Sequence, residues 1–198
     1  MIWRIRKHNK PQSLVLGAAV LVATSCGGTL FKIRPPTDLQ PLRGPVKSAT
    51  AAGLTIRVAP LLSDEESQEL FEANLPLSGV LPVRVELEHE SGLPVELKRA
   101  RFRLRGSNGE WKALSTKKSI SRMLKANGVF AYNPNSKRQF VDEFSVYGLD
   151  VKVPLTAAEK RRQGFLFFET PDKTSVKSPQ GLVLLIEGLA EPVEVRLN

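Results

Sequence analysis

The feature that most constrains the fold is an alternation of apolar and charged side chains over residues 80–90. Successive side chains of a β-strand point to opposite faces, so this pattern predicts a strand with one buried and one exposed face. The expected inward positions are Val83, Val85, Leu87 and His89, and the expected outward positions are Arg84, Glu86, Glu88 and Glu90. We interpret His89 as a structural residue at the strand end.

A second strand is expected after a turn at residues 91–92, and the two strands would form a central hairpin. The apolar side chains of residues 95–97 have the opposite parity to those of residues 100–104. Because one extra residue exchanges the two faces of a strand, we predict a β-bulge near residues 98–99.

Beyond this bulge, arginine occupies every second position on the expected outer face: Arg99, Arg101, Arg103 and Arg105. One interpretation is a platform for an anionic ligand, such as a phosphate-bearing glycan or a lipid head group. The alternative, which we favour, is that the acidic face of the neighbouring strand neutralises the row. Cross-strand pairs with Glu86, Glu88 and Glu90 would contribute about 0.2–1 kcal/mol each.

Further strands are predicted on both sides of the hairpin. Residues 54–60 and 192–197 alternate, whereas residues 164–169 and 182–186 are continuous apolar runs that suit strands buried on both faces. These strands, separated by Gly and Pro turns, indicate a mainly all-β fold, an antiparallel immunoglobulin-like β-sandwich over residues 54–198. The expected core includes Val83, Val85, Leu87, Phe102, Leu104, Phe165, Phe167, Leu184 and Ile186.

One or two short helices are expected to accompany the sheet. Ser63 and Glu66 have the spacing of a capping box, which predicts a helix over residues 64–73. We interpret the acidic residues of its first turn as favourable charges at a helix N-terminus rather than as a metal site. Apolar side chains at helical spacing predict a second helix over residues 116–126.

Residues 116–143 are interpreted as an insertion at a loop end of the sandwich, with a loop over residues 130–140 and a return to strand over residues 144–153. Its mixture of basic and aromatic side chains suits an acidic protein or glycan surface. The alternative is that the insertion only covers one end of the sandwich. The candidate partner-binding residues are Lys117, Lys118, Arg122, Lys125, Phe130, Tyr132, Lys137, Arg138 and Phe140, followed by Arg99, Arg101, Arg103 and Arg105.

Residues 1–25 have the order of a secretory signal peptide: a basic start without acids, an uncharged apolar stretch and small residues at the end. The uncharged stretch covers the 13 residues 13–25. A membrane-spanning helix needs roughly 17–25 residues, so this stretch is a poor permanent anchor. We therefore expect the chain to be exported.

The residues before Cys26, which are Val22, Ala23, Thr24 and Ser25, resemble the lipobox of bacterial lipoproteins, although the commonest form has Leu at the position of Ala23. The resemblance implies cleavage between Ser25 and Cys26 and attachment of diacylglycerol to the Cys26 thiol. Cys26 is the only cysteine, so the chain has no intrachain disulfide. The alternatives are an ordinary signal cleaved after Ser25 and an uncleaved signal anchor.

Most of the net charge of +9 lies before the expected domain. Residues 1–25 hold +4 and residues 27–53 hold +3, which leaves +2 for residues 54–198. A nearly balanced exported domain is not an expected partner of nucleic acid. Residues 26–53 are rich in Pro and Gly and lack a strand or helix period, so we expect a lipidated N-terminus followed by a disordered tether. Contact of the tether with anionic head groups is the alternative to a fully solvated tether.

The order of Leu70-Phe71, residues 81–85, Pro94-Val95 and residues 164–168 is similar to that of uncharacterised bacterial lipoproteins with an immunoglobulin-like or telokin-like sandwich. The resemblance covers roughly residues 53–198. It implies a fold and a cell-envelope setting, and it carries over no catalytic or ligand-binding residue.

The sequence lacks the Gly-x-Ser-x-Gly, Gly-x-x-x-x-Gly-Lys and His-Glu-x-x-His motifs. We therefore expect a non-catalytic binding or structural protein without cofactor or metal, held to the membrane through Cys26 and contacting an envelope protein or glycan. The alternatives are a passive spacer and an envelope enzyme whose site one sequence does not reveal.

We predict that the mature chain begins at a lipidated Cys26, because two acyl chains give durable attachment at about 0.8 kcal/mol per buried CH₂. Mass spectrometry of the mature N-terminal peptide checks this prediction, and an unmodified Cys26 or a retained Met1 would contradict it.

Gly27, where inner-membrane lipoproteins often have Asp, implies by resemblance the outer membrane of a diderm cell, facing the periplasm or the cell surface. Fractionation of the envelope tests that location.

Overall fold

Alternating side chains build eight strands into one antiparallel sheet with the order β1-β2-β3-β6-β5-β4-β7-β8. The computed structural model describes residues 39–40, 42, 46–51, 53–90, 92–129 and 134–198. The strands are β1 (Lys47–Ala51), β2 (Leu54–Pro60), β3 (Val80–His89), β4 (Arg101–Gly106), β5 (Gly109–Leu114), β6 (Arg161–Glu169), β7 (Val183–Glu187) and β8 (Val193–Arg196).

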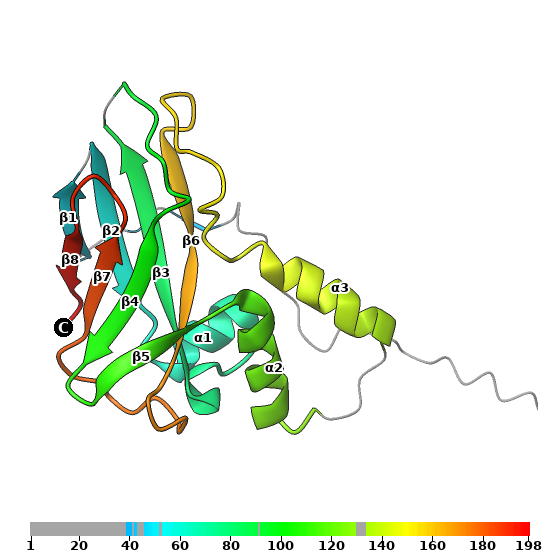
Figure 1. The fold of residues 1–198 in the computed structure, drawn as a ribbon. Coiled ribbons are helices and arrows are strands. Elements are labelled where there is room, and N and C mark those ends of the chain that lie inside the picture. The colour runs from blue at the N-terminus through cyan, green and yellow to red at the C-terminus, as the bar shows by residue number, and fades with distance from the viewer. Residues whose placement is uncertain (1–38, 41, 43–45, 52, 91, 130–133) are drawn as a thin grey trace, which may run out of the picture.

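The sheet curls until its two edge strands, β1 and β8, lie side by side (Figure 1). The fold is therefore a nearly closed barrel, and the expectation of a mainly antiparallel all-β protein is confirmed. The expected division into the two packed sheets of an immunoglobulin-like sandwich is not supported. Strand β5 pairs with β6 along one edge and with β4 along the other, so it joins both halves into one sheet.

Every second side chain of each strand points into the barrel, and these side chains fill its interior. Val85 of β3 lies between Val58 of β2 and Gly164 of β6 in the register of the sheet. Leu97, Leu149 and Leu155, which belong to connections rather than strands, pack into the same core. Among the residues expected in the core, six are buried here, and Phe102 is partly buried against them. The six are Val83, Val85, Leu87, Leu104, Leu184 and Ile186.

Strand β6 buries its outer face as well, which confirms the prediction made from residues 164–169. Its outward Phe165 and Phe167 pack with aromatic rings of the helices in a second cluster. The ring of Phe71 lies at the centre of this cluster. Its centroid is 5.1 Å from that of Phe165, 5.3 Å from that of Phe144 and 5.2 Å from that of Tyr147.

The helices beside this cluster are α1 (Asp64–Phe71), α2 (Thr116–Ala126) and α3 (Pro134–Ser145), with a short 3-10 helix, η2 (Pro76–Ser78), between α1 and β3. Helices α1 and α3 supply aromatic rings, whereas α2 supplies Ile120, Met123 and Leu124. Figure 1 shows the three α-helices on the side of the barrel away from β8. The predicted capping box of α1 is confirmed, because Ser63 Oγ accepts from Glu66 N at 3.2 Å and the Glu66 carboxylate accepts from Ser63 N at 3.3 Å. Helix α2 has the predicted bounds.

The predicted central hairpin is wrong. Strand β3 pairs with β2 and β6, whereas β4 pairs with β5 and β7. Residues 98–99 form a turn rather than a β-bulge, and Ala100 N donates to Leu97 O at 2.8 Å. The change of parity arises because Val95 belongs to a separate segment that bridges to Leu155.

The loop predicted over residues 130–140 is wrong from Pro134 onward, because α3 begins there. Proline is tolerated at the first helical position, where its N–H has no intrahelical partner to lose. Phe140 and Phe144 lie one turn apart and are both fully buried. The strand expected over residues 144–153 does not form. In its place, Phe165 N donates to Tyr147 O at 2.6 Å, a short bridge beside β6.

The folded part begins before the expected boundary at residue 54. Strand β1 pairs with β2 from Lys47 opposite Val58 to Ala51 opposite Leu54, and Leu39 is buried. The prediction of a disordered tether is therefore wrong for β1 and for Leu39. A segment that pairs with an existing strand needs no apolar period of its own. Residues 1–38, which include the predicted signal, Ser25 and Cys26, lie outside the described residues.

We predict that Phe71→Ala lowers the free energy of unfolding by about 3–5 kcal/mol, because it removes the central ring of the aromatic cluster. Leu77, which is 53 % exposed, is the control. Leu77→Ala is expected to change the free energy by about 0.5 kcal/mol or less. Chemical denaturation followed by circular dichroism measures both changes, and equal losses would contradict the central position of Phe71.

Candidate functional site

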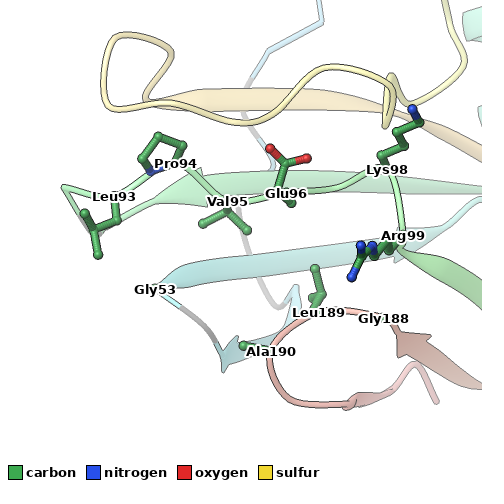
Figure 2. Close-up of a pocket in the computed structure, with 10 residues that line it drawn as sticks. All are labelled: Gly53, Leu93, Pro94, Val95, Glu96, Lys98, Arg99, Gly188, Leu189 and Ala190. Carbon is green, nitrogen blue, oxygen red and sulfur yellow. The ribbon is translucent and has the colours of Figure 1, made fainter.

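A groove of about 1060 Å³ opens at the end of the barrel where three connections meet (Figure 2). These connections are the β3–β4 segment, the β7–β8 turn and the β1–β2 turn. The lining residues are Gly53, Leu93, Pro94, Val95, Glu96, Lys98, Arg99, Gly188, Leu189 and Ala190.

Apolar side chains face each other across this groove. Figure 2 shows Val95 directed toward Leu189, with Leu93 near one end and Arg99 near the other. The carboxylate of Glu96 and the amine of Lys98 point away from Leu189, whereas the guanidinium of Arg99 points toward it. The groove therefore combines apolar walls with one cationic group at one end.

Backbone contacts hold the walls of the groove in place. Val95 N donates to Leu155 O at 2.8 Å, and Leu155 N donates to Val95 O at 3.0 Å. On the other wall, Gly188 has a φ of 82°, and a Cβ at this position would lie 2.1 Å from Arg99 O. Only glycine allows the β7–β8 turn to approach the Arg99 backbone so closely. The position of Arg99 is therefore fixed relative to Leu189.

This arrangement can bind a ligand but offers no recognisable chemistry. Apolar walls with a few placed polar groups are typical of ligand pockets at the mouths of β-barrels. Within the described parts of the chain, no group of three or more His, Cys, Asp or Glu side chains is placed to hold a metal ion. His89, predicted to be structural, is nearly buried, and its Nε2 lies 2.7 Å from Leu93 O.

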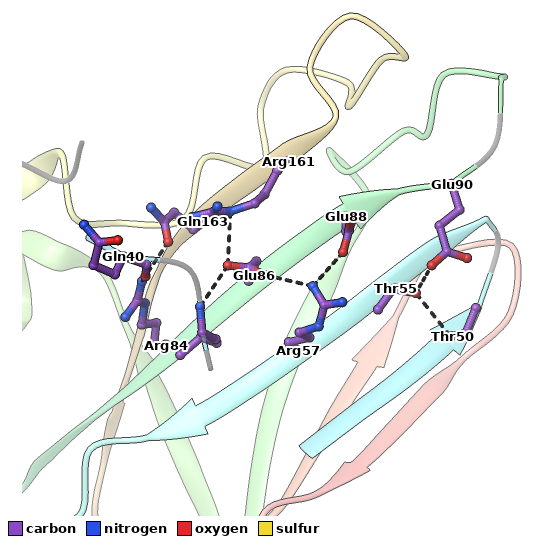
Figure 3. A network of polar contacts seen from close by, with 11 residues as sticks. Gln40, Thr50, Thr55, Arg57, Arg84, Glu86, Glu88, Glu90, Arg161 and Gln163 are labelled. Atoms are coloured by element: carbon purple, nitrogen blue, oxygen red, sulfur yellow. Dashed lines mark hydrogen bonds and ion pairs between the residues drawn. The ribbon is translucent and has the colours of Figure 1, made fainter. Parts of the chain in front are cut away.

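A polar network occupies the outer face of β2, β3 and β6 (Figure 3). Its centre is Glu86, whose side chain is 1 % exposed. Glu86 Oε1 lies 3.0 Å from Arg57 Nη1, and Glu86 Oε2 lies 3.1 Å from Arg161 Nε. The Leu42 N–H also donates to Glu86 Oε2 at 3.2 Å. Arg57 donates hydrogen bonds to Glu88 and to Glu86. These bonds raise the pKa of Arg57 above its ordinary value, and the bond to Glu88 has the larger effect.

The same network fixes the chain that leads into the barrel. Arg84 Nη2 donates to Gln40 O and, at 2.8 Å, to Gln163 Oε1. Gln163 Nε2 donates in turn to Leu39 O at 3.0 Å. Burial lowers the pKa of the Arg84 guanidinium below its ordinary value. These contacts attach the main chain before β1 to the outer face of β3 and β6, so we interpret the network as structural.

The predicted neutralisation of the arginine row by Glu86, Glu88 and Glu90 is wrong, because β3 is not a neighbour of β4. Those three acids contact Arg57, Arg161 and Thr55. The alternation itself is confirmed, since Arg101, Arg103 and Arg105 are exposed on β4. Arg103 Nε lies 3.6 Å from Glu187 Oε2 of β7. Arg99 lies in the turn before β4 and lines the groove.

The basic residues of the predicted insertion stay on the surface. Lys117, Lys118 and Lys125 of α2 are exposed, as are Lys137 and Arg138 of α3. Arg122 is instead an anchoring residue, because its Nη2 lies 2.5 Å from Glu169 Oε1 of β6.

The aromatic part of the predicted insertion site does not reach the surface as expected. The interpretation of Phe140 as a partner-binding residue is wrong, because its side chain is fully buried beside Phe144. Phe130 and Tyr132 lie outside the described residues. Burial of Phe140 follows from α3, because the helix turns this side chain toward the aromatic cluster.

Sequence reasoning missed the groove. Its two walls are about 90 residues apart in the chain, and neither carries a motif. A local signal is Leu93, a large apolar residue that directly follows the predicted turn and is 76 % exposed in the structure. The sequence pattern assigns Arg99 to the arginine row, because arginine continues at every second position over residues 99–105.

Comparisons of the chain with protein-family models, with curated proteins and with solved structures found no match. Among the described residues, no helix has the length and apolar character needed to cross a membrane.

We predict that Glu86→Gln lowers the free energy of unfolding by about 1–3 kcal/mol, because the buried carboxylate that Arg57 and Arg161 share would be lost. Glu88, whose side chain is 43 % exposed, is the matched control. Glu88→Gln is expected to cost about 1 kcal/mol or less, since a pair in contact with water is worth little. Urea denaturation measures both variants. Equal losses of unfolding free energy in the two variants would show that the burial of Glu86 contributes nothing to stability.

Proposed function

We propose that this protein is a non-catalytic, membrane-anchored binding protein of the cell envelope, and that its ligand site is the groove at the end of the barrel. The anchoring part of the proposal is supported by the signal-like residues 1–25 and by the resemblance of residues 22–26 to a lipobox. In a diderm cell, Gly27 favours the outer membrane. A lipid-anchored chain keeps its ligand site near the membrane.

The observation that carries the binding role is the pairing of apolar walls with a single directed guanidinium. Val95 and Leu189 provide apolar surface, and Arg99 provides a charge-assisted donor at one end. Arg99 is exposed, and no ion pair within the described part of the chain involves it. An arginine fork matches a carboxylate or a phosphate in two parallel hydrogen bonds.

The chemistry of the groove fits an amphiphile with one extended apolar chain and one anionic group. The chain would lie between Val95 and Leu189, and the anionic group would accept hydrogen bonds from Arg99. The open side of the groove leaves the rest of a larger ligand in water. A glycan lacks the first feature, because it has little apolar surface. A protein strand lacks the second, because it need not carry a single anionic group.

We predict that the protein binds dansyl-undecanoate, an apolar chain with a terminal carboxylate, and that Ala190→Trp weakens this binding about tenfold or more by filling the groove. Ala190 is exposed, so the larger side chain should not disturb the core. Dansyl fluorescence measures the affinity. Ala126→Trp, at the exposed C-terminal end of α2, is the control and should bind normally.

The role of Arg99 is tested with the methyl ester of the same compound. Arg99→Glu should weaken binding of the carboxylate about tenfold or more and leave the ester unaffected, because only the carboxylate accepts a charge-assisted bond. Arg105→Glu makes the same charge change on the exposed row and should affect neither. A protein that binds neither compound would support a passive spacer and contradict the proposal.

A further inference from the structure

We propose that the exposed basic face of α2 docks on a membrane surface that carries anionic lipid head groups. This face is formed by Lys117, Lys118 and Lys125. The inference rests on the proposed anchoring of the chain to a membrane, which it deepens by assigning the side of the domain that faces the lipid.

The charge of this face is not balanced within α2 itself, while the neighbouring α3 carries two basic and two acidic residues. Helix α2 contains four basic residues and no acidic residue. Its one ion pair within the described residues is that of Arg122 with Glu169, so Lys117, Lys118 and Lys125 keep their charges exposed. Lys118 and Lys125 are seven residues apart, which places them on one stripe of the helix, two turns from each other.

The packing of α2 fixes which way these lysines point. Ile120, Met123 and Leu124 are buried in the aromatic cluster on one side of the helix. Ser115 caps the first turn by accepting from Lys118 N at 3.4 Å. The ion pair between Arg122 and Glu169 ties the helix to the end of β6. The basic face is therefore held outward by a rigid scaffold.

The chain enters the fold on this same side. Leu39 is buried in the cluster that also contains the apolar residues of α2 and α3, and Gln163 binds its carbonyl oxygen. Only 13 residue steps separate Cys26 from Leu39. Fully extended, they span about 45 Å, so an anchor at Cys26 holds Leu39 within about that distance of the bilayer. At that distance even weak electrostatic contacts become effective.

The composition of the face favours lipid over a folded protein partner. Protein interfaces bury an apolar centre and are depleted in lysine. The outward side of α2 carries lysines with Ser121 and Ala126 and no exposed large apolar side chain. Diffuse attraction to head groups needs no packed centre, and each lysine close to an anionic surface raises binding about fivefold.

The test uses the full lipoprotein, extracted from membranes and reconstituted into vesicles of phosphatidylcholine alone or with one quarter phosphatidylglycerol. Acetylation of lysines, read by mass spectrometry, reports which side chains are covered. We expect Lys117, Lys118 and Lys125 to react several-fold more slowly in the anionic vesicles at about 50 mM salt, and the protection to be lost at about 0.5 M salt, where charges are screened. Exposed Lys152 and Lys177 should react equally in both vesicles.

Variants assign the effect to the helix. Lys118→Glu with Lys125→Glu should abolish the protection of Lys117, whereas Lys152→Glu with Lys177→Glu makes the same charge change elsewhere and should preserve it. Equal acetylation in the two kinds of vesicle would overturn the proposal. Protection by soluble polyglutamate but not by phosphatidylglycerol would also overturn it and assign the face to an acidic protein.

Failure of the anchor is distinguishable from failure of the basic face. Flotation with pure phosphatidylcholine vesicles at about 0.5 M salt depends on the lipid anchor alone, because surface attraction is screened. A protein that does not float there contradicts the proposed anchoring. A protein that floats but shows no protection of α2 contradicts only the orientation.

Discussion

Strand β6 packs apolar side chains on both of its faces, and each face holds a different part of the molecule. Phe168 points into the barrel core, while Phe165 and Phe167 point outward into the aromatic cluster with Phe71 and Phe144. The barrel and the helices therefore share one strand, and neither layer can be disturbed without moving the other. Close packing of this kind transmits small displacements, because interiors contain few voids.

The outer face of β3 and β6 changes character along its length. Near Phe165 and Phe167 it is aromatic and lies against the helices. Toward the other end, Arg84, Glu86 and Gln163 replace the aromatic rings, and the chain before β1 lies over them. Main-chain amides and carbonyls give these side chains hydrogen-bond partners in addition to those that they find among themselves, and buried polar groups are stabilised by such partners. The contacts of Arg84, Glu86 and Gln163 thus determine where the chain before β1 lies on the sheet.

Local patterns in the sequence predicted individual strands and helices better than they predicted which strands pair with each other. The alternation of β3, the double burial of β6, the capping box at Ser63 and helix α2 were all predictable, because each depends on neighbours within a few residues. The pairing of β4 with β7 depends on contacts about 80 residues apart. Residues 80–105 look like a hairpin in any local pattern, and only the global order of the sheet decides against it. The groove was unpredictable for the same reason.

The two proposed contact surfaces lie at different ends of the barrel. Figure 1 places α2, which follows β5, beside one end of the barrel. The β1–β2 and β7–β8 turns that line the groove lie at the opposite end. If α2 faces the bilayer, the groove faces away from it. An apolar chain bound between Val95 and Leu189 then cannot enter sideways from the anchoring membrane, because the height of the barrel intervenes. The ligand must arrive from the aqueous compartment or from another protein, and the charge on Arg99 serves to select it there.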